Sequence, residues 1–170
     1  MKNNFFDDMF MEELEDIIST GFCDTLEEGI EYIANTDILY LEFKHFLIRL
    51  EAIENFSRLS MKREEKIRQE FVNDEDMKFA FARLHNIVFR MGEMDTVRIE
   101  KICLYNLNTN DSEIICDAMK ICLSSGQVLF FDPAYYFGIN IGDETLIPIW
   151  EDQNKNYTVT IIDKKTSERA

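Results

Sequence analysis

The sequence predicts an α+β fold, in which about five N-terminal helices pack on a C-terminal, mainly antiparallel β-sheet. The first 132 residues contain no proline, the strongest helix breaker. Apolar residues recur at helical spacing as far as Gly92, and after it they alternate with polar residues as in half-buried strands. We expect residues 1–170 to form one domain, with a helical part (1–92), a β-rich part (93–163) and a loose tail (164–170).

Three of the predicted helices cover the first third of the chain. The first spans residues 4–21, and the second begins at a capping box made by Thr25 and Glu28. The third spans residues 37–59. The apolar faces of these helices would be, in order, Phe6, Phe10, Leu14 and Ile17; Leu26, Ile30 and Ile33; and Leu39, Phe43, Phe46, Leu50 and Ile53.

Two more helices and a set of strands complete the predicted fold. Residues 61–72 read as a charged, solvated helix, and Asn73 as the N-cap of a helix that ends at Gly92. The segment Ser124–Gln127 has the composition of a hairpin turn. Consecutive strands with short links favour antiparallel pairing, and we place them near residues 97–104, 114–123, 128–131, 146–150 and 157–162.

Negative charge is concentrated near the N-terminus. Residues 1–42 contain twelve Asp and Glu and one Lys, so this quarter of the chain carries −11 of the formal net charge of −15. A solvated helix face usually interleaves Lys with Glu, because like charges one turn apart repel. The first two predicted helices carry acidic residues without such interleaved lysines. We therefore predict a partner-binding acidic surface on them, with two merely solvated faces as the alternative reading. Its residues are Asp8, Glu12, Glu15, Asp16, Glu27, Glu28 and Glu31.

The charge also indicates the class of partner. A field of this sign repels nucleic acid and anionic membranes, and it speeds association with basic proteins. In functional class the profile resembles toxin-immunity proteins and phage-encoded inhibitors of bacterial defence. That resemblance implies a non-enzymatic inhibitor that mimics nucleic acid and blocks a basic, nucleic-acid-acting protein such as a nuclease or toxin domain.

A second candidate site lies in the segment after the predicted hairpin. Asp132, Tyr135 and Tyr136 precede Gly138 in an aromatic-rich stretch. Asp before Pro commonly starts a turn, so these aromatic residues could simply close the core. Tyrosine is also frequent in binding sites, so the alternative function is a small ligand-binding or regulatory domain that uses the Asp132–Phe137 loop. An enzyme of unfamiliar type that uses carboxylates is the third hypothesis.

The sequence predicts no catalytic residue, cofactor or metal site, because it lacks the usual nucleotide-binding, zincin and hydrolase motifs. The cysteines form no CxxC pair, and we expect free thiols. Cys116 and Cys122 would lie on one side of a strand and fill the core, with a redox or metal role as the alternative. The first residues lack a secretory signal, and no apolar run reaches membrane-spanning length, so we expect a cytoplasmic location. The four cysteines are Cys23, Cys103, Cys116 and Cys122.

Overall fold

The fold is built mainly from antiparallel strands, which contradicts the predicted bundle of about five helices. A computed structural model describes residues 4–26, 29–70, 73, 76–89, 97–109, 113–134 and 138–164. Within these residues there are twelve strands and three short helices. The helices are α1 (Asn4–Met11), α2 (His85–Val88) and α3 (Leu146–Gln153).

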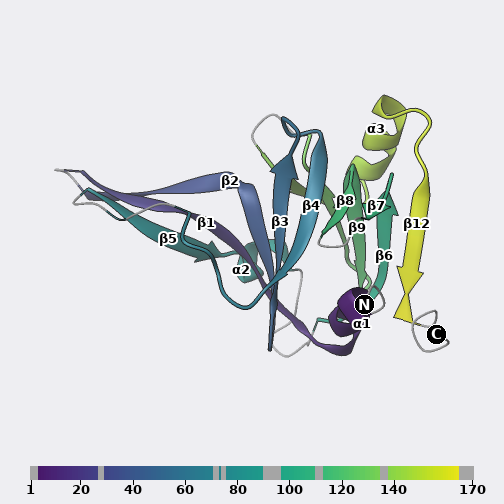
Figure 1. The fold of residues 1–170 in the computed structure, drawn as a ribbon, viewed down its shortest axis with the longest axis horizontal. Coiled ribbons are helices and arrows are strands. Elements are labelled where there is room, and N and C mark those ends of the chain that lie inside the picture. The colour runs from purple at the N-terminus through teal and green to yellow at the C-terminus, as the bar shows by residue number, and fades with distance from the viewer. Residues whose placement is uncertain are drawn as a thin grey trace.

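The strands form two sheets (Figure 1). Within each sheet, the described neighbouring strands pair in antiparallel orientation. The seven-stranded sheet has the order β5-β1-β2-β3-β4-β8-β7 and the five-stranded sheet the order β11-β10-β9-β6-β12. The seven-stranded sheet contains β1 (Leu14–Leu26), β2 (Gly29–Phe43), β3 (Leu47–Ile53), β4 (Arg58–Glu64), β5 (Met77–Arg83), β7 (Asn108–Thr109) and β8 (Ile114–Cys116). The five-stranded sheet contains β6 (Ile99–Tyr105), β9 (Ala118–Leu123), β10 (Val128–Asp132), β11 (Asn140–Gly142) and β12 (Val159–Asp163).

One hydrophobic core lies between the inner faces of the two sheets. Leu41 and Leu50 of the seven-stranded sheet and Leu104 and Ile121 of the five-stranded sheet belong to the same buried cluster. Full burial of each such side chain stabilises the fold by about 1.5–3 kcal/mol. Helix α3 covers the outer face of the smaller sheet, where Trp150 packs against Phe130, Tyr105 and Cys103.

The helices predicted over residues 4–59 are wrong beyond α1, and the reason is the spacing of their apolar residues. Leu39 and Phe43 are four residues apart, a spacing that puts two side chains on one face of either a helix or a strand. Leu41 distinguishes the two cases, since it shares their face only in a strand. It is fully buried in the core with them. The continuous run Ile38–Leu41 is a strand buried on both faces.

The helix caps predicted at Thr25 and Asn73 are also wrong, because both residues make other hydrogen bonds. Thr25 lies in β1, and both its backbone nitrogen and its hydroxyl donate to the carbonyl of Asp76 at 2.9 Å. Among the described residues no helix lies between Asn73 and β5, and the side-chain oxygen of Asn73 accepts from the backbone nitrogen of Phe79 at 2.7 Å. Glu28 lies outside the described residues.

The later part of the chain was predicted better. The hairpin turn after β9 is confirmed: Leu123 donates to the carbonyl of Gln127 at 2.9 Å, and Gly126 has φ 83°. The strand predicted over residues 146–150 is wrong, because this segment is helix α3. Of the predicted tail, residues 165–170 lie outside the described residues.

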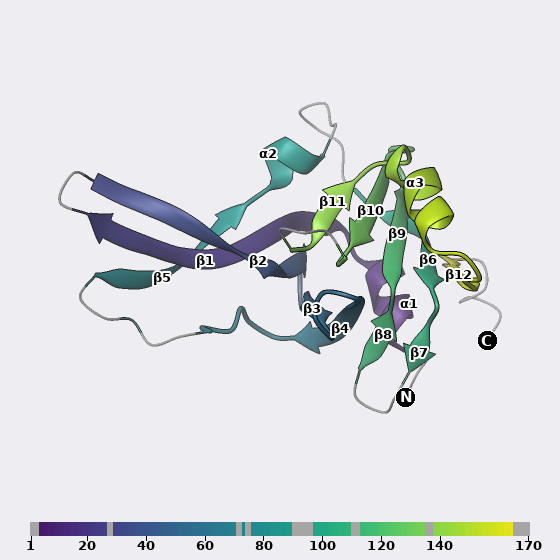
Figure 2. The same ribbon diagram turned by 90° about the horizontal axis from the view of Figure 1, so that it is seen from above.

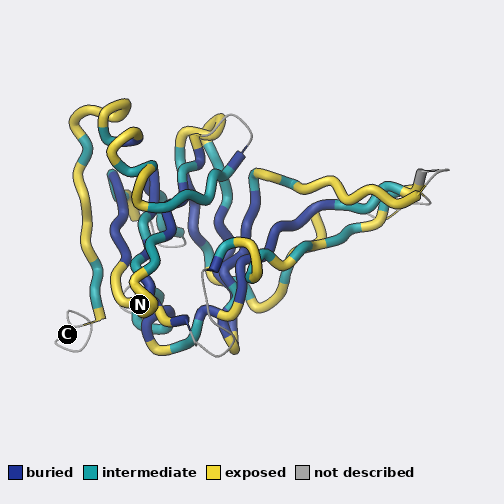
Figure 3. Tube along the Cα trace, turned by 180° about the vertical axis from the view of Figure 1, so that it is seen from behind, coloured by how far each residue is buried: buried dark blue, intermediate teal, exposed yellow. Residues whose placement is uncertain are grey.

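The outer halves of β1 and β2, together with β5, project from the body along the longest axis of the molecule (Figures 1 and 2). We call this three-stranded extension the arm, defined as residues 21–26, 29–34 and 77–83. Buried residues lie mostly in the body, while the arm is intermediate or exposed toward its tip (Figure 3).

Candidate functional site

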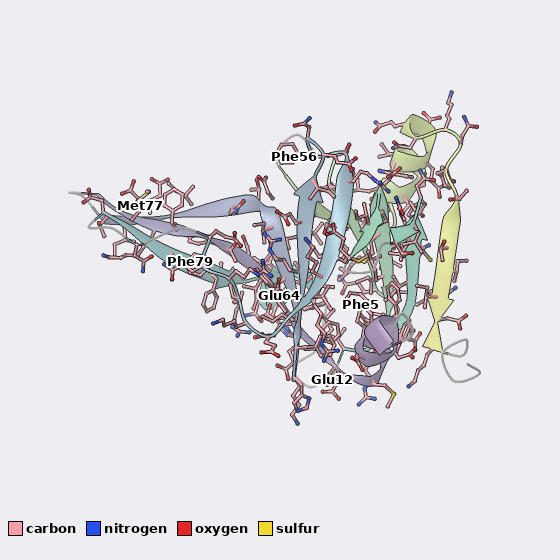
Figure 4. The ribbon with its side chains drawn as sticks, viewed as in Figure 1. Phe5, Glu12, Phe56, Glu64, Met77 and Phe79 are labelled. Atoms are coloured by element: carbon pink, nitrogen blue, oxygen red, sulfur yellow. The ribbon has the colours of Figure 1, made fainter. Side chains whose placement is uncertain are left out.

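The arm is a regular antiparallel sheet whose register determines which side chains share a face. Phe22 lies between Ile33 of β2 and Phe79 of β5, so these three side chains lie on one face. Phe81 is two residues along β5 and lies on that face too. Met77 and Phe79 are labelled on the arm in Figure 4.

The arm exposes several large apolar side chains. Ile30 is 74% exposed, Phe81 49%, Ile33 38% and Tyr32 37%. Ile30 and Tyr32 lie on the face opposite to Ile33 and Phe81, because neighbouring residues of a strand point to opposite faces. Single exposed apolar residues are ordinary, but here four come together on one projecting element.

Carboxylates lie among these apolar side chains toward the tip of the arm. Asp24 of β1 stands directly opposite Glu31 of β2, on the face that carries Phe22. Two like charges in such a cross-strand pair destabilise the sheet. Lys78 pairs with Cys23 and therefore lies on the other face. The arm thus presents an apolar surface with negative charge beside it.

An ion-pair cluster stabilises the base of the arm. Arg83, at the end of β5, contacts Glu42 with both terminal nitrogens and Asp16 at 3.3 Å. Asp16 is 5% exposed, and its own Oδ1 accepts from the backbone nitrogen of Ile17 at 2.8 Å. The hydrogen bond with Glu42 raises the pKa of Arg83. This cluster joins β1, β2 and β5 where the arm leaves the body.

The seven carboxylates predicted as one acidic surface do not lie on two helix faces. Among those that the structure describes, only Asp8 lies in a helix, and its carboxylate pairs with Arg63. Glu12 accepts from the backbone nitrogen of His45 at 3.1 Å and contacts its ring at 2.9 Å. Glu15 is exposed, and it lies in β1 at the irregularity in register between Leu14 and the buried Asp16. Of the remaining three, Glu31 is exposed on the arm, and Glu27 and Glu28 lie outside the described residues.

Asp132, from the second predicted site, lies at the end of β10 and is half-buried. Its carboxylate accepts from the backbone nitrogen of Ala134 at 3.0 Å and is hydrogen-bonded to the Trp150 side chain. Burial raises the pKa of Asp132, and these two hydrogen bonds partly oppose the increase. Tyr135 and Tyr136 lie outside the described residues, so the structure does not bring the three predicted residues together.

A cavity of about 350 Å³ lies elsewhere, between α2, β10, β11 and α3. Ile87, Leu129, Ile141 and Leu146 form much of its apolar wall, and Asp132 does not line it. Among the described residues, no group of three or more His, Cys, Asp or Glu side chains could hold a metal ion. No helix in the described part of the chain is long and apolar enough to cross a membrane.

All four cysteines are free thiols. The prediction that Cys116 and Cys122 share a strand is wrong, since Cys116 ends β8 and Cys122 lies in β9 of the other sheet. Burial raises the pKa of the Cys116 thiol to about 12 and raises that of Cys103 as well. Both thiols are therefore poor nucleophiles.

Sequence reasoning missed the arm because it assigned residues 21–34 to helices. A signal for a strand was nevertheless present in one short run. In residues 77–83, Met77, Phe79 and Phe81 alternate with small or charged residues. Strict alternation over such a run is typical of a half-buried strand.

Comparison of the chain with models of known protein families, with curated protein sequences and with solved structures finds no match.

Proposed function

We propose that this chain is a non-enzymatic protein-binding domain that docks a basic partner protein on its arm. The observation that carries the proposal is the group of exposed apolar side chains on a sheet that projects from the core. Two of these side chains lie on each face of the arm. Exposed apolar side chains gathered on one element are typical of an interaction site, because their contact with water is unfavourable until a partner covers them. The group consists of Ile30, Tyr32, Ile33 and Phe81.

Charge supports the choice of a basic partner. The formal net charge of −15 attracts positively charged proteins at long range, and Asp24 and Glu31 add negative charge on the arm itself. Nucleic-acid-handling proteins present Lys and Arg to phosphates and belong to this class of partner. Occupation of such a basic surface would block it, so inhibition is the proposed consequence of docking.

We further propose that the protein works in the cytoplasm. Its four thiols are unpaired, and Cys103 and Cys116 are buried inside the fold. Unpaired thiols are typical of proteins kept in a reducing compartment.

The test compares variants of the arm with matched variants of the body. A basic partner is first selected from a displayed library with the wild-type chain, and its affinity is then measured for each variant. Replacement of Ile30 and Phe81 by serine should weaken binding about tenfold or more, because each loses apolar contact worth on the order of 1 kcal/mol. The control replaces Ile149 and Ile161, which are 55% and 58% exposed, by serine.

The control should bind as the wild type does, since neither residue lies on the arm. Equal affinity of the wild type and the arm variant, combined with weaker binding by the body variant, would contradict the proposal. All variants change exposed side chains, so their unfolding transitions should stay close to that of the wild type.

A further inference from the structure

The outer edge of β2 is open along the arm. Strand β3 pairs with β2 only from Ile38 inward, where Ile38 stands opposite Glu51. Over Gly29–Ala34, β2 pairs with β1 on one side, and no strand in the described part of the chain pairs with its other side. All six residues of this edge are exposed.

The register shows which backbone groups point outward from this edge. Leu84 donates to the carbonyl of Ile17 at 2.8 Å, so the odd-numbered residues of β1 bond to β5 and the even-numbered ones to β2. Phe22 and Ile33 therefore exchange hydrogen bonds. Along Gly29–Ala34, the backbone groups of the odd-numbered residues point toward β1, and those of the even-numbered residues point outward. The outward N–H and C=O groups belong to Ile30, Tyr32 and Ala34, and the structure gives them no hydrogen-bond partner among the described residues.

Within the described part of the chain, Gly29–Ala34 lacks the features that usually block strand addition, and the nearest contact on this side of β2 is the hydrogen bond from the Ile139 nitrogen to the Thr36 carbonyl. Proteins protect such edges with proline, β-bulges, inward-pointing charges or a covering segment. Gly29–Ala34 contains no proline, and its register with β1 is regular from Leu26 to Gly21. Its one charged residue is Glu31, and Ile30, Tyr32 and Ile33 supply apolar side chains on both faces of the strand.

We infer that the β2 edge over Gly29–Ala34 binds an extended segment of the partner, in which Lys or Arg alternates with apolar residues, by adding it as a further strand of the arm. The inference rests on the proposed function and specifies how the arm recognises its partner. Main-chain hydrogen bonds to three outward-facing residues would hold the segment, and the alternating side chains would select its sequence.

Charge complementarity selects this occupant over a second copy of the chain. Glu31 lies on the edge with Asp24 beside it on the same face, so a basic side chain opposite Glu31 would meet two carboxylates. A second copy would instead bring another chain with a net charge of −15 against this one. It would place like charges side by side.

The probe is a fluorescent peptide of about ten residues, longer than a typical strand, in which lysine alternates with valine and threonine. Two further versions carry N-methyl groups on either the odd or the even residues, so that each blocks one edge of the extended peptide while side chains and charge stay the same. We expect the unmodified peptide to bind, and one N-methylated version to lose at least about tenfold in affinity while the other keeps it. Hydrogen exchange should slow at the amides of Ile30, Tyr32 and Ala34.

A backbone variant tests the same edge from the side of the protein. The N–H of Ile30 points away from β1, so Ile30→Pro removes an outward donor and leaves the hydrogen bonds of the β1–β2 ladder in place. This variant should weaken peptide binding about tenfold, and Ile30→Val, which keeps the N–H, should bind as the wild type does. The N-methylated peptides decide the matter independently if the proline variant unfolds.

Each contrary outcome has a distinct meaning. Equal loss for both N-methylated versions, or slowed exchange elsewhere on the arm, overturns strand addition but leaves docking on the arm intact. Failure of the unmodified peptide to bind overturns the assigned partner chemistry. Sedimentation that shows a dimer of this chain, with slowed exchange at the same three amides, assigns the edge to a second copy and overturns the inference.

Discussion

The carboxylate of Asp132 is held at the end of β10 by two hydrogen bonds, from the backbone of Ala134 and from the Trp150 side chain. Trp150 belongs to an aromatic cluster in which its ring lies 4.8 Å from that of Tyr105 and 5.7 Å from that of Tyr157. Asp132 thus joins β10 to α3 on the outer face of the five-stranded sheet. This is a structural role, and it differs from the ligand-binding role that its sequence context suggested.

The raised pKa of Asp132 gives a prediction about stability and pH. An unfolded Asp titrates near pH 4, and burial raises the pKa of Asp132 in the folded chain. At pH values between the pKa of the unfolded Asp and the raised pKa of the folded one, the folded state binds more protons than the unfolded state. The contribution of this site to the free energy of unfolding therefore falls as pH rises through this range. Asp132→Asn removes the titration, and its stability relative to the wild type should increase as pH rises above the ordinary Asp pKa. Urea unfolding at a series of pH values measures this.

Asp132→Ala is the control for the hydrogen bonds. It also removes the titration, but it leaves the Ala134 nitrogen and the Trp150 side chain without this acceptor. Such a loss costs about 1–3 kcal/mol at every pH. A stability difference between Asp132→Asn and the wild type that declines as pH rises would contradict the assigned direction of the pKa shift.

Within the strands that form the arm, Gly21 is a position where the backbones of β1 and β2 approach closely. A Cβ at Gly21 would overlap the carbonyl oxygen of Ile33, a backbone atom that cannot move aside cheaply. The register of the two strands shifts here, between Ser19 and Gly21, where the arm meets the body. Glycine therefore allows β1 and β2 to stay paired through the irregularity.

We predict that Gly21→Ala destabilises the fold by about 1–3 kcal/mol, the usual cost of forcing an extra methyl group into a closely packed site. Denaturant unfolding measures this change, and binding of a partner to the arm should weaken in parallel. Cys23→Ala is the matched control, because Cys23 lies two residues further along the same face and its side chain becomes smaller. A stability of Gly21→Ala within about 0.5 kcal/mol of the wild type would show that the strands can separate there at little cost.

The sequence allowed some elements to be predicted and not others, for physical reasons. The turn at Gly126 and the strands β6, β9, β10 and β12 depend on local composition and alternation, which a sequence displays directly. In β2 and β3 the apolar residues sit four apart or in continuous runs, and both patterns suit a buried strand as well as a helix. Only long-range pairing between the two strands, such as Leu39 with Leu50, decides between them.

At the scale of the whole molecule, the predicted acidic site also depends on contacts between residues that are far apart in the sequence. The sequence shows that negative charge gathers near the N-terminus, and Glu15 and Glu31 are exposed. Asp8 and Asp16 are instead neutralised by arginines that lie 55 and 67 residues away in the sequence. Such ion pairs form only after the sheet has assembled, so local charge patterns could not predict them.

The net charge of the molecule leads to a prediction about association rates. The carboxylates on the arm, the partly buried Asp24 and the exposed Glu31, should steer a basic partner to the docking surface, and salt should screen this attraction beyond about 10 Å. We predict that Asp24→Asn combined with Glu31→Gln slows association about two- to tenfold at low salt and flattens its salt dependence, with little change in dissociation. Folding should be unaffected or slightly improved, because the change removes a cross-strand repulsion.

Stopped-flow mixing at increasing salt concentrations measures these rates. The matched control is Glu144→Gln combined with Asp152→Asn, which removes two exposed carboxylates at and near α3, away from the arm. Both double variants change the net charge equally, so any difference between them reports where the charge lies. If both slow association to the same extent, the partner responds to the overall field alone, and the carboxylates of the arm have no special part in docking. If the arm variant alone is slowed, steering is local and the partner first meets the protein at the arm.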